Sequence, residues 1–143
     1  MTQPRILVAD DDKDTVLSLT TLLREEGYNV RGVYRGSEVL QAVFHFAPDI
    51  VLLDIGMPHM SGYDVARTLR ERYGSARPVL IAVTGRAGAL DRAQSHAAGF
   101  EHHVAKPYDP RALLALLASV APRPPSPGAQ PGQSPPGQRE RAP

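Results

Sequence analysis

The chain has 143 residues, of which 42% are hydrophobic and 22% are charged, the composition of an ordinary globular protein about one domain in size. It contains no cysteine, which excludes disulfide frameworks, thiolate zinc sites and thiol catalysis. With 16 basic and 15 acidic side chains the net charge is +1, so the chain has no general attraction to nucleic acid. No apolar run approaches the roughly 20 residues of a membrane span, and the N-terminus lacks a signal-peptide pattern. We therefore expect a cytoplasmic protein without membrane contact.

Short apolar runs alternate with helix-length amphipathic segments over the first 120 residues. The runs expected to form strands are, in chain order, Arg5–Ala9, Tyr28–Val33, Asp49–Leu53, Pro78–Val83 and Glu101–Ala105. The segments expected to form helices are Lys13–Glu26, Ser37–Phe46, Tyr63–Tyr73, Ala89–Ala98 and Pro110–Val120. The second of these helices places Val39, Leu40, Val43 and Phe44 on one face, which we expect to pack in the core.

This alternation predicts the fold class. Five β–α units of about 20 residues each indicate an α/β fold, a flavodoxin-like (βα)5 doubly wound parallel sheet with strand order 2-1-3-4-5. Right-handed crossovers then place helices on both faces of the sheet. Ligands of such sheets bind beyond the carboxyl ends of the strands, where the strand order reverses. The residues that directly follow each strand are therefore the first candidates for a functional site.

The composition changes near residue 121. Eight of the 14 prolines lie in Pro122–Pro143, a segment with almost no apolar side chain. A segment that buries no apolar surface does not recover its ordering entropy. We therefore predict one folded domain over residues 1–121 and a disordered Pro/Gly-rich tail over residues 122–143. The Pro-x-x-Pro spacing at Pro122–Pro125 and at Pro124–Pro127 leaves open a recognition role for this tail.

Acidic, hydroxyl and ammonium side chains follow the predicted strands. They are Asp10, Asp11 and Asp12 after the first strand, Asp54 after the third, Thr84 after the fourth and Lys106 after the fifth. Strands 1, 3, 4 and 5 are neighbours in the predicted order, so these groups should meet at one edge of the sheet. Three clustered carboxylates repel one another by on the order of 4 kcal/mol per pair at about 4 Å, which one lysine does not neutralise. Mg²⁺ beside a phosphate does, so the pattern predicts a magnesium site for phosphoryl chemistry, with Asp12 instead capping the next helix.

Four segments carry motifs at these strand ends. They are Ile6–Asp12 (ILVADDD), Pro48–Gly62 (PDIVLLDIGMPHMSG), Ala82–Gly85 (AVTG) and Val104–Pro107 (VAKP). In this order they resemble the receiver (response regulator) domain of two-component signal transduction, in its stand-alone single-domain form. The likeness covers about residues 4–121.

The resemblance implies a role for each of these groups. Asp54 would accept a phosphoryl group from a sensor histidine kinase or a histidine phosphotransfer protein. The implied ligands of Mg²⁺ are Asp10, Asp11, Asp54 and the backbone carbonyl of Gly56. Lys106 would pair with the phosphoryl oxygens, the Lys106–Pro107 bond would be cis, and the Thr84 hydroxyl would move to the phosphoryl group as a switch. The domain would catalyse only its own phosphorylation and autodephosphorylation, so it would not otherwise be an enzyme.

The resemblance also shows a departure from the family pattern. His103 stands where the family usually has Tyr or Phe, an aromatic side chain that rotates inward as Thr84 moves. An imidazole has less apolar area and titrates near neutral pH, so we expect a switch that is weaker, differently coupled or pH-sensitive. Arg86, two residues after Thr84, would reach the phosphate.

The output and three rival functions complete the prediction. Since no helix-turn-helix segment follows the domain, we expect output through an unknown downstream protein on the helix 4–strand 5–helix 5 face, which also suits a homodimer, or through a phosphorelay. A phosphorylation-independent receiver-fold interaction module is the main alternative, against which the intact acidic, hydroxyl and lysine set argues. A haloacid-dehalogenase-type phosphatase needs a second acid where Gly56 stands, and a flavodoxin-type carrier needs a Ser/Thr-rich loop where the chain has three aspartates.

Overall fold

The computed structural model describes residues 3–74, 77–85 and 89–120. Its strands are β1 (Arg5–Ala9), β2 (Asn29–Val33), β3 (Ile50–Asp54), β4 (Val79–Thr84) and β5 (His102–Ala105). Its helices are α1 (Lys13–Glu25), α2 (Gly36–Phe46), α3 (Gly62–Tyr73), α4 (Ala89–Ala98) and α5 (Pro110–Val120). Each predicted element is present, and both ends of every element lie within one residue of the prediction.

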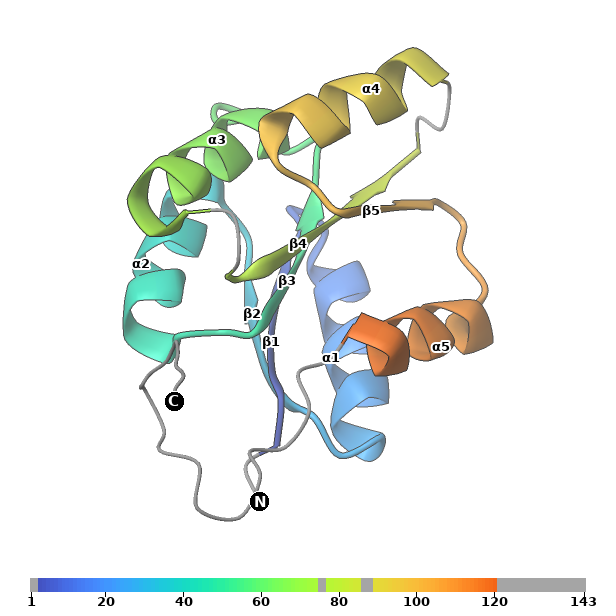
Figure 1. Cartoon of the computed structure of the whole chain (residues 1–143). Coiled ribbons are helices and arrows are strands. Elements are labelled where there is room, and N and C mark those ends of the chain that lie inside the picture. The colour runs from blue at the N-terminus through green and yellow to red at the C-terminus, as the bar shows by residue number, and fades with distance from the viewer. Residues whose placement is uncertain (1–2, 75–76, 86–88, 121–143) are drawn as a thin grey trace, which may run out of the picture.

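The five strands form one parallel sheet in the order β2-β1-β3-β4-β5 (Figure 1). Helices α1 and α5 cover one face of this sheet, and α2, α3 and α4 cover the other (Figure 1). The predicted flavodoxin-like doubly wound fold is therefore confirmed. The strand order reverses between β1 and β3, which places the expected ligand site at the carboxyl ends of these two neighbouring strands.

The core consists of two layers, because successive residues of a strand point to opposite faces of the sheet. In β1, Ile6 and Val8 pack with α1 and α5, whereas Leu7 and Ala9 pack with α2 and α3. All five residues of β3 are buried, as expected for the central strand of a parallel sheet covered on both sides. This strand therefore has little freedom to move, and the last of its residues is Asp54.

The apolar face of α2 differs from the prediction. The structure buries Val39, Val43 and Phe46 on α2, and Phe44 is 72% exposed. With 100° between successive residues, a helix face that contains Val39, Val43 and Phe46 turns Phe44 away from the sheet. The Phe46 ring also lies under the guanidinium group of Arg31, 4.6 Å from the ring centroid. The choice of Phe44 as a core residue was therefore wrong.

Two further expectations concern the chain as a whole. Within residues 3–74, 77–85 and 89–120, the structure has no helix that is both long and apolar enough to cross a membrane. The tail predicted over residues 122–143 lies outside the described residues, so its disorder stays a prediction.

Candidate functional site

The candidate site lies at the carboxyl edge of the sheet. Asp10 directly follows β1, Asp54 ends β3, Thr84 ends β4 and Lys106 directly follows β5. Asp10, Asp54 and Thr84 are 4%, 8% and 5% exposed. Such burial is unusual for the two carboxylates, since aspartate is rarely buried without partners. The fold thus brings together four groups that are separated by up to 96 residues along the chain.

Three carboxylates cluster in the site. Each of Asp10, Asp11 and Asp54 offers one oxygen, and these oxygens lie within 4.8 Å of one another. The Lys106 ammonium lies 2.8 Å from Asp10 Oδ2 and 3.8 Å from Asp54 Oδ2. One cation therefore faces three anions, so the cluster keeps an excess of negative charge.

Backbone groups fix the orientation of these carboxylates. The Asp12 N–H donates to Asp10 Oδ1 at 2.9 Å, and the Gly56 N–H donates to Asp54 Oδ1 at 3.1 Å. The Asp12 side chain itself accepts from the Asp14 N–H and caps α1, as predicted. Because one oxygen of Asp10 and one of Asp54 are held by the backbone, their second oxygens face Lys106.

The loop from β3 to α3 packs closely beneath Asp54. The Gly62 N–H donates to the Ile55 carbonyl at 3.0 Å. A Cβ atom on Gly62 would lie 2.7 Å from Ile55 Cα and 2.9 Å from the Asp54 carbonyl oxygen, closer than real Cβ contacts allow. Glycine at this position therefore lets the start of α3 rest against the backbone that carries Asp54.

The protonation equilibria of Asp54 and Lys106 follow from this arrangement. Burial raises the pKa of the Asp54 carboxyl, and the Asp10 and Asp11 charges raise it further, against the opposing effects of the Gly56 N–H and Lys106. Burial alone would lower the pKa of the Lys106 ammonium, but the hydrogen bond from Lys106 to Asp10 and the charge of Asp54 outweigh it, so this pKa is raised. An additional positive charge near Asp54 would therefore stabilise the ionised form of its carboxylate.

The donor set fits a hard divalent cation. Carboxylate oxygens are the ligands that Mg²⁺ prefers, and it keeps several waters when it binds through only a few protein oxygens. Asp11 is exposed and its neighbours are buried, so the cluster is open to solvent on one side. The Gly56 carbonyl, the fourth expected ligand, stays a prediction; its amide is the group that contacts Asp54.

The predicted switch residues lie along the same edge. Thr84 pairs with Ala105 in the β4–β5 register, and His103 pairs with Ala82 two residues further from the site. The side chain of His103 is half-buried.

Two peptide bonds that precede proline are cis. The Lys106–Pro107 bond is cis, as the resemblance implied, and the Arg77–Pro78 bond, for which no prediction was made, is also cis. Arg86 lies outside the described residues.

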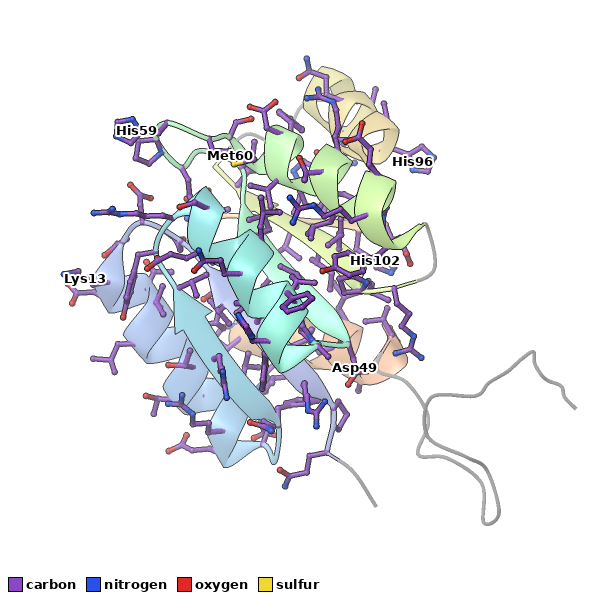
Figure 2. All side chains as sticks on the ribbon, turned by 90° about the vertical axis from the view of Figure 1, so that its left-hand side faces the viewer. Lys13, Asp49, His59, Met60, His96 and His102 are labelled. Carbon is purple, nitrogen blue, oxygen red and sulfur yellow. The ribbon has the colours of Figure 1, made fainter. Side chains whose placement is uncertain are left out.

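Acidic residues elsewhere do not join the site. Asp49 directly precedes β3 and lies at the opposite end of the molecule from Lys13 and His59 (Figure 2). Its carboxylate accepts from the Arg5 N–H at 2.9 Å and pairs with the Arg77 guanidinium at 3.1 Å. Asp49 thus ties strand ends together, whereas Asp54, five residues later, lies in the acidic cluster.

One feature near the site was missed by the sequence analysis. A cavity of about 610 Å³ lies beside Asp11, between the loops that follow β1, β2 and β3. Three of its lining side chains are basic, namely Lys13, Arg35 and His59. The sequence does show one basic residue in each of the three segments that follow a strand end. Whether these three residues meet at one cavity depends on the conformations of the loops.

Comparison with known proteins agrees with this geometry. The response regulator receiver domain family model matches residues 6–118. The chain is 38% identical over 113 residues to the DNA-binding response regulator MtrA of Mycolicibacterium smegmatis, and 36% identical to MtrA of Mycobacterium tuberculosis. Each alignment covers 79% of this chain and 48% of the relative, so the chain spans about half the length of these curated relatives.

Solved structures give the same result for the fold. The chemotaxis protein CheY4 of Vibrio cholerae superimposes with a TM-score of 0.79 at 23% identity, over 83% of this chain and 99% of that one. A CheY-like response regulator receiver domain protein of Methanospirillum hungatei superimposes with a TM-score of 0.76 at 29% identity, over 82% and 93% of the two chains. Since the family model matches most of the chain and its relatives share more than a third of the aligned residues, the chain belongs to the response regulator receiver domain family.

Proposed function

We propose that Asp54 accepts a phosphoryl group from the phosphohistidine of a sensor histidine kinase or a histidine phosphotransfer protein, in a reaction that depends on Mg²⁺. The observation that supports this most directly is the meeting of three carboxylate oxygens within 4.8 Å, with the Lys106 ammonium 3.8 Å from Asp54. An acidic cluster with two buried carboxylates and one lysine is costly as a structural device. It is well suited to holding a metal ion next to a transferred phosphoryl group.

The chemistry follows from the orientation of the groups. A carboxylate oxygen of Asp54 forms the new bond to phosphorus and the P–N bond to the donor breaks. The donor imidazole, which carries a proton on its other ring nitrogen, leaves in its neutral form with the electron pair of the broken bond. The Gly56 N–H holds Asp54 Oδ1 at 3.1 Å, which orients the nucleophile before the donor arrives. Lys106 and the Thr84 hydroxyl are the chain's own partners for the phosphoryl oxygens in this proposal.

Asp10, Asp11, Asp54 and the Gly56 carbonyl are the proposed metal ligands. When bound, Mg²⁺ supplies the positive charge that offsets both these carboxylates and the phosphoryl oxygens. The acyl phosphate formed on Asp54 is hydrolysed slowly by water in the same pocket. The domain acts on its own carboxylate only, so in this proposal it is not an enzyme with an external substrate.

The proposed output is a change in shape at the edge formed by α4, β5 and α5, or transfer of the phosphoryl group along a relay. Thr84 ends β4 at the site, and His103 lies on the adjacent strand β5, which is part of this edge; this supports them as the residues that respond to phosphorylation. A downstream protein, or a second copy of the chain, would recognise the altered face. A cytoplasmic location belongs to the same proposal.

The experiment is phosphorylation of the full chain with a small acyl-phosphate donor and Mg²⁺, read by intact mass. We expect the mass of one added phosphate, no addition in Asp54→Asn, and none with a chelator. Asp12→Asn is the matched control, because Asp12 lies in the same acidic run but caps α1; it should be modified like the wild type. An unmodified wild type would favour the alternative, an interaction module that works without phosphorylation.

A further inference from the structure

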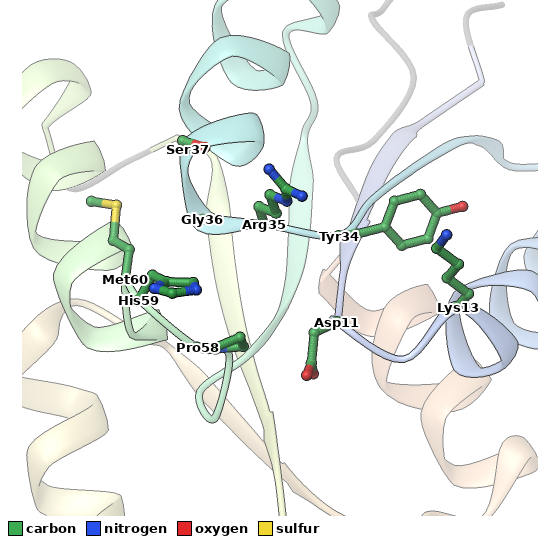
Figure 3. Close-up of a pocket in the computed structure, with 9 residues that line it drawn as sticks. All are labelled: Asp11, Lys13, Tyr34, Arg35, Gly36, Ser37, Pro58, His59 and Met60. Carbon is green, nitrogen blue, oxygen red and sulfur yellow. The ribbon is translucent and has the colours of Figure 1, made fainter.

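The cavity beside Asp11 adjoins the phosphoacceptor pocket and shares Asp11 with it. Its volume of about 610 Å³ falls within the range of small-molecule sites, about 300–1,000 Å³. The lining residues come from three segments, the start of α1, the β2–α2 connection and the β3–α3 loop, and Figure 3 shows them around one opening. Asp54 and Lys106 are not among its lining residues, so the phosphorylation chemistry does not account for it.

Two cationic side chains of this cavity, Lys13 and Arg35, form no ion pair with any residue that the structure describes. Within the described part of the chain, neither Lys13 nor Arg35 lies within 4.0 Å of a carboxylate oxygen. The Lys13 ammonium lies over the Tyr34 ring, 5.8 Å from its centroid. The carboxylate of Glu38, in the first turn of α2, accepts the Tyr34 N–H at 2.9 Å. The positive charge is therefore available to a ligand.

Arg35 is an unfavourable choice for its local structure. It is the N-cap residue of α2 and its side chain makes no capping hydrogen bond. Asp, Asn, Ser and Thr are preferred at this position, and a positive charge near a helix N-terminus opposes the helix dipole. Arg35 is therefore unfavourable for the stability of α2, and its side chain lines a cavity. Binding of a ligand by Arg35 would explain why an arginine is present at this position. Guanidinium groups suit phosphate and carboxylate, which they bind through two parallel hydrogen bonds.

The remaining lining residues define the rest of the ligand. Tyr34 lines the cavity on the side of Lys13, and Pro58 and Met60 line the other side (Figure 3). These side chains offer aromatic and apolar surface that a bare inorganic ion does not need. His59 has φ 71°, the left-handed conformation that histidine adopts more readily than most residues, and lies beside Pro58 and Met60 (Figure 3). The single acidic lining residue is Asp11, which repels an anion when its charge is not neutralised.

We propose that this cavity binds a small organic anion, either an organic phosphate or a polycarboxylate. Its charged groups pair with Arg35 and Lys13, and its apolar part lies against Pro58 and Met60, on the side of the opening away from Lys13 (Figure 3). The site adjoins Asp11, so its occupancy is coupled to the charge state of the acidic cluster, and any such coupling is reciprocal. The proposal does not depend on phosphorylation of Asp54.

The test is a titration of the ¹⁵N-labelled full chain with four probes, without Mg²⁺ and with a chelator present. The probes are ADP, citrate, inorganic phosphate and adenosine, which separate an organic phosphate, a polycarboxylate, a bare anion and an uncharged ring. We expect saturable shifts of the Ser37 and Met60 amide signals with ADP, with citrate or with both, and at least about tenfold weaker binding of phosphate and adenosine. Binding to the phosphoacceptor pocket would instead move the signals of Gly56 and Lys106.

Three variants complete the experiment. Arg35→Ala should weaken binding about tenfold, as expected for loss of a charge-assisted contact. Asp11→Asn should strengthen it about threefold, because it removes the repelling charge. Arg67→Ala, which removes an equal charge from the exposed Asp64–Arg67 pair on α3, should change it less than twofold. Opposite effects of two cavity variants exclude misfolding as the cause.

The proposal is overturned by any of three results. The first is the absence of saturable shifts at Ser37 and Met60 with both ADP and citrate up to about 10 mM. The second is equal weakening by Arg35→Ala and Arg67→Ala, which would indicate unspecific charge attraction. The third is binding of inorganic phosphate as tight as that of the organic probes. Because no phosphodonor or Mg²⁺ is present, failure here leaves the mass experiment on Asp54 unaffected.

Discussion

Replacing Asp54 by asparagine should stabilise the metal-free protein, although it removes the proposed phosphoacceptor. Asp54 faces two carboxylates, with ligand oxygens within 4.8 Å, and one ammonium at 3.8 Å. At an effective dielectric constant of about 20, each repulsion is about 3.5 kcal/mol and the attraction about 4 kcal/mol. The repulsion therefore dominates by about 3 kcal/mol, and solvent screening of the exposed Asp11 reduces this further. We expect Asp54→Asn to increase the free energy of unfolding by about 1–2 kcal/mol at pH 7.

The pH dependence gives this prediction a definite sign. Burial and the neighbouring carboxylates raise the pKa of Asp54 above its ordinary value of 3.8. A raised carboxyl pKa in the folded state lowers stability wherever the group is ionised, and this loss disappears as pH falls through the folded pKa to the unfolded value. The advantage of Asp54→Asn should therefore be full at pH 7 and shrink steadily as the pH is lowered toward 4.

Urea unfolding with a chelator present, at several pH values, measures this effect. Glu71→Gln, which neutralises an exposed carboxylate on α3, is the matched control and should change stability by less than about 0.5 kcal/mol. An Asp54→Asn protein that is less stable than the wild type at pH 7 would refute the reasoning. So would a stability difference that grows on acidification.

Three further predictions concern the metal, the β3–α3 loop and α2. Adding MgCl₂ should raise the midpoint of thermal unfolding of the wild type by mass action, and Asp11→Asn should lose at least half of that shift. Gly62→Ala should destabilise by about 2 kcal/mol or more, because its Cβ meets backbone at 2.7 Å, whereas Gly56→Ala, with its nearest neighbour at 3.7 Å, should cost under about 1 kcal/mol in urea unfolding. Phe46→Ala should cost about 3 kcal/mol and Phe44→Ala less than about 0.5 kcal/mol by the same measurement; similar costs would contradict the assigned helix face.

Much of the fold could be predicted from the sequence, because its signals are local and mutually consistent. Apolar runs at about 20-residue spacing, separated by amphipathic segments, restrict the chain to a parallel sheet with a known strand order. The convergence of Asp10, Asp54 and Lys106 followed, since parallel strands end at the same edge. Phe44 and Phe46 were harder, because the apolar residues of α2 spread over more than one face, and the packing of α2 on the sheet decides which ring is buried.

The finer geometry of the site needed coordinates. The sequence pattern places Lys106 near the acids, but it does not indicate that the ammonium binds Asp10 at 2.8 Å and lies 3.8 Å from Asp54. This preference depends on side-chain reach across two strands. The cavity lined by Arg35 and His59 is a product of three loop conformations, and periodicity carries no information about loops.

The rigidity of β3 determines which residues can move when the charge on Asp54 changes. Asp54 sits at the end of a wholly buried strand, with Gly56 bound to its side chain and Gly62 packed on its backbone. A strand that is packed in this way does not shift when the charge on Asp54 changes. Adjustment must therefore be taken up by the more exposed surroundings, and Lys106, shared between two acids, is the contact best placed to exchange partners first. Substitutions that adjust the response should therefore occur at the residues around Asp54, and not within β3 itself.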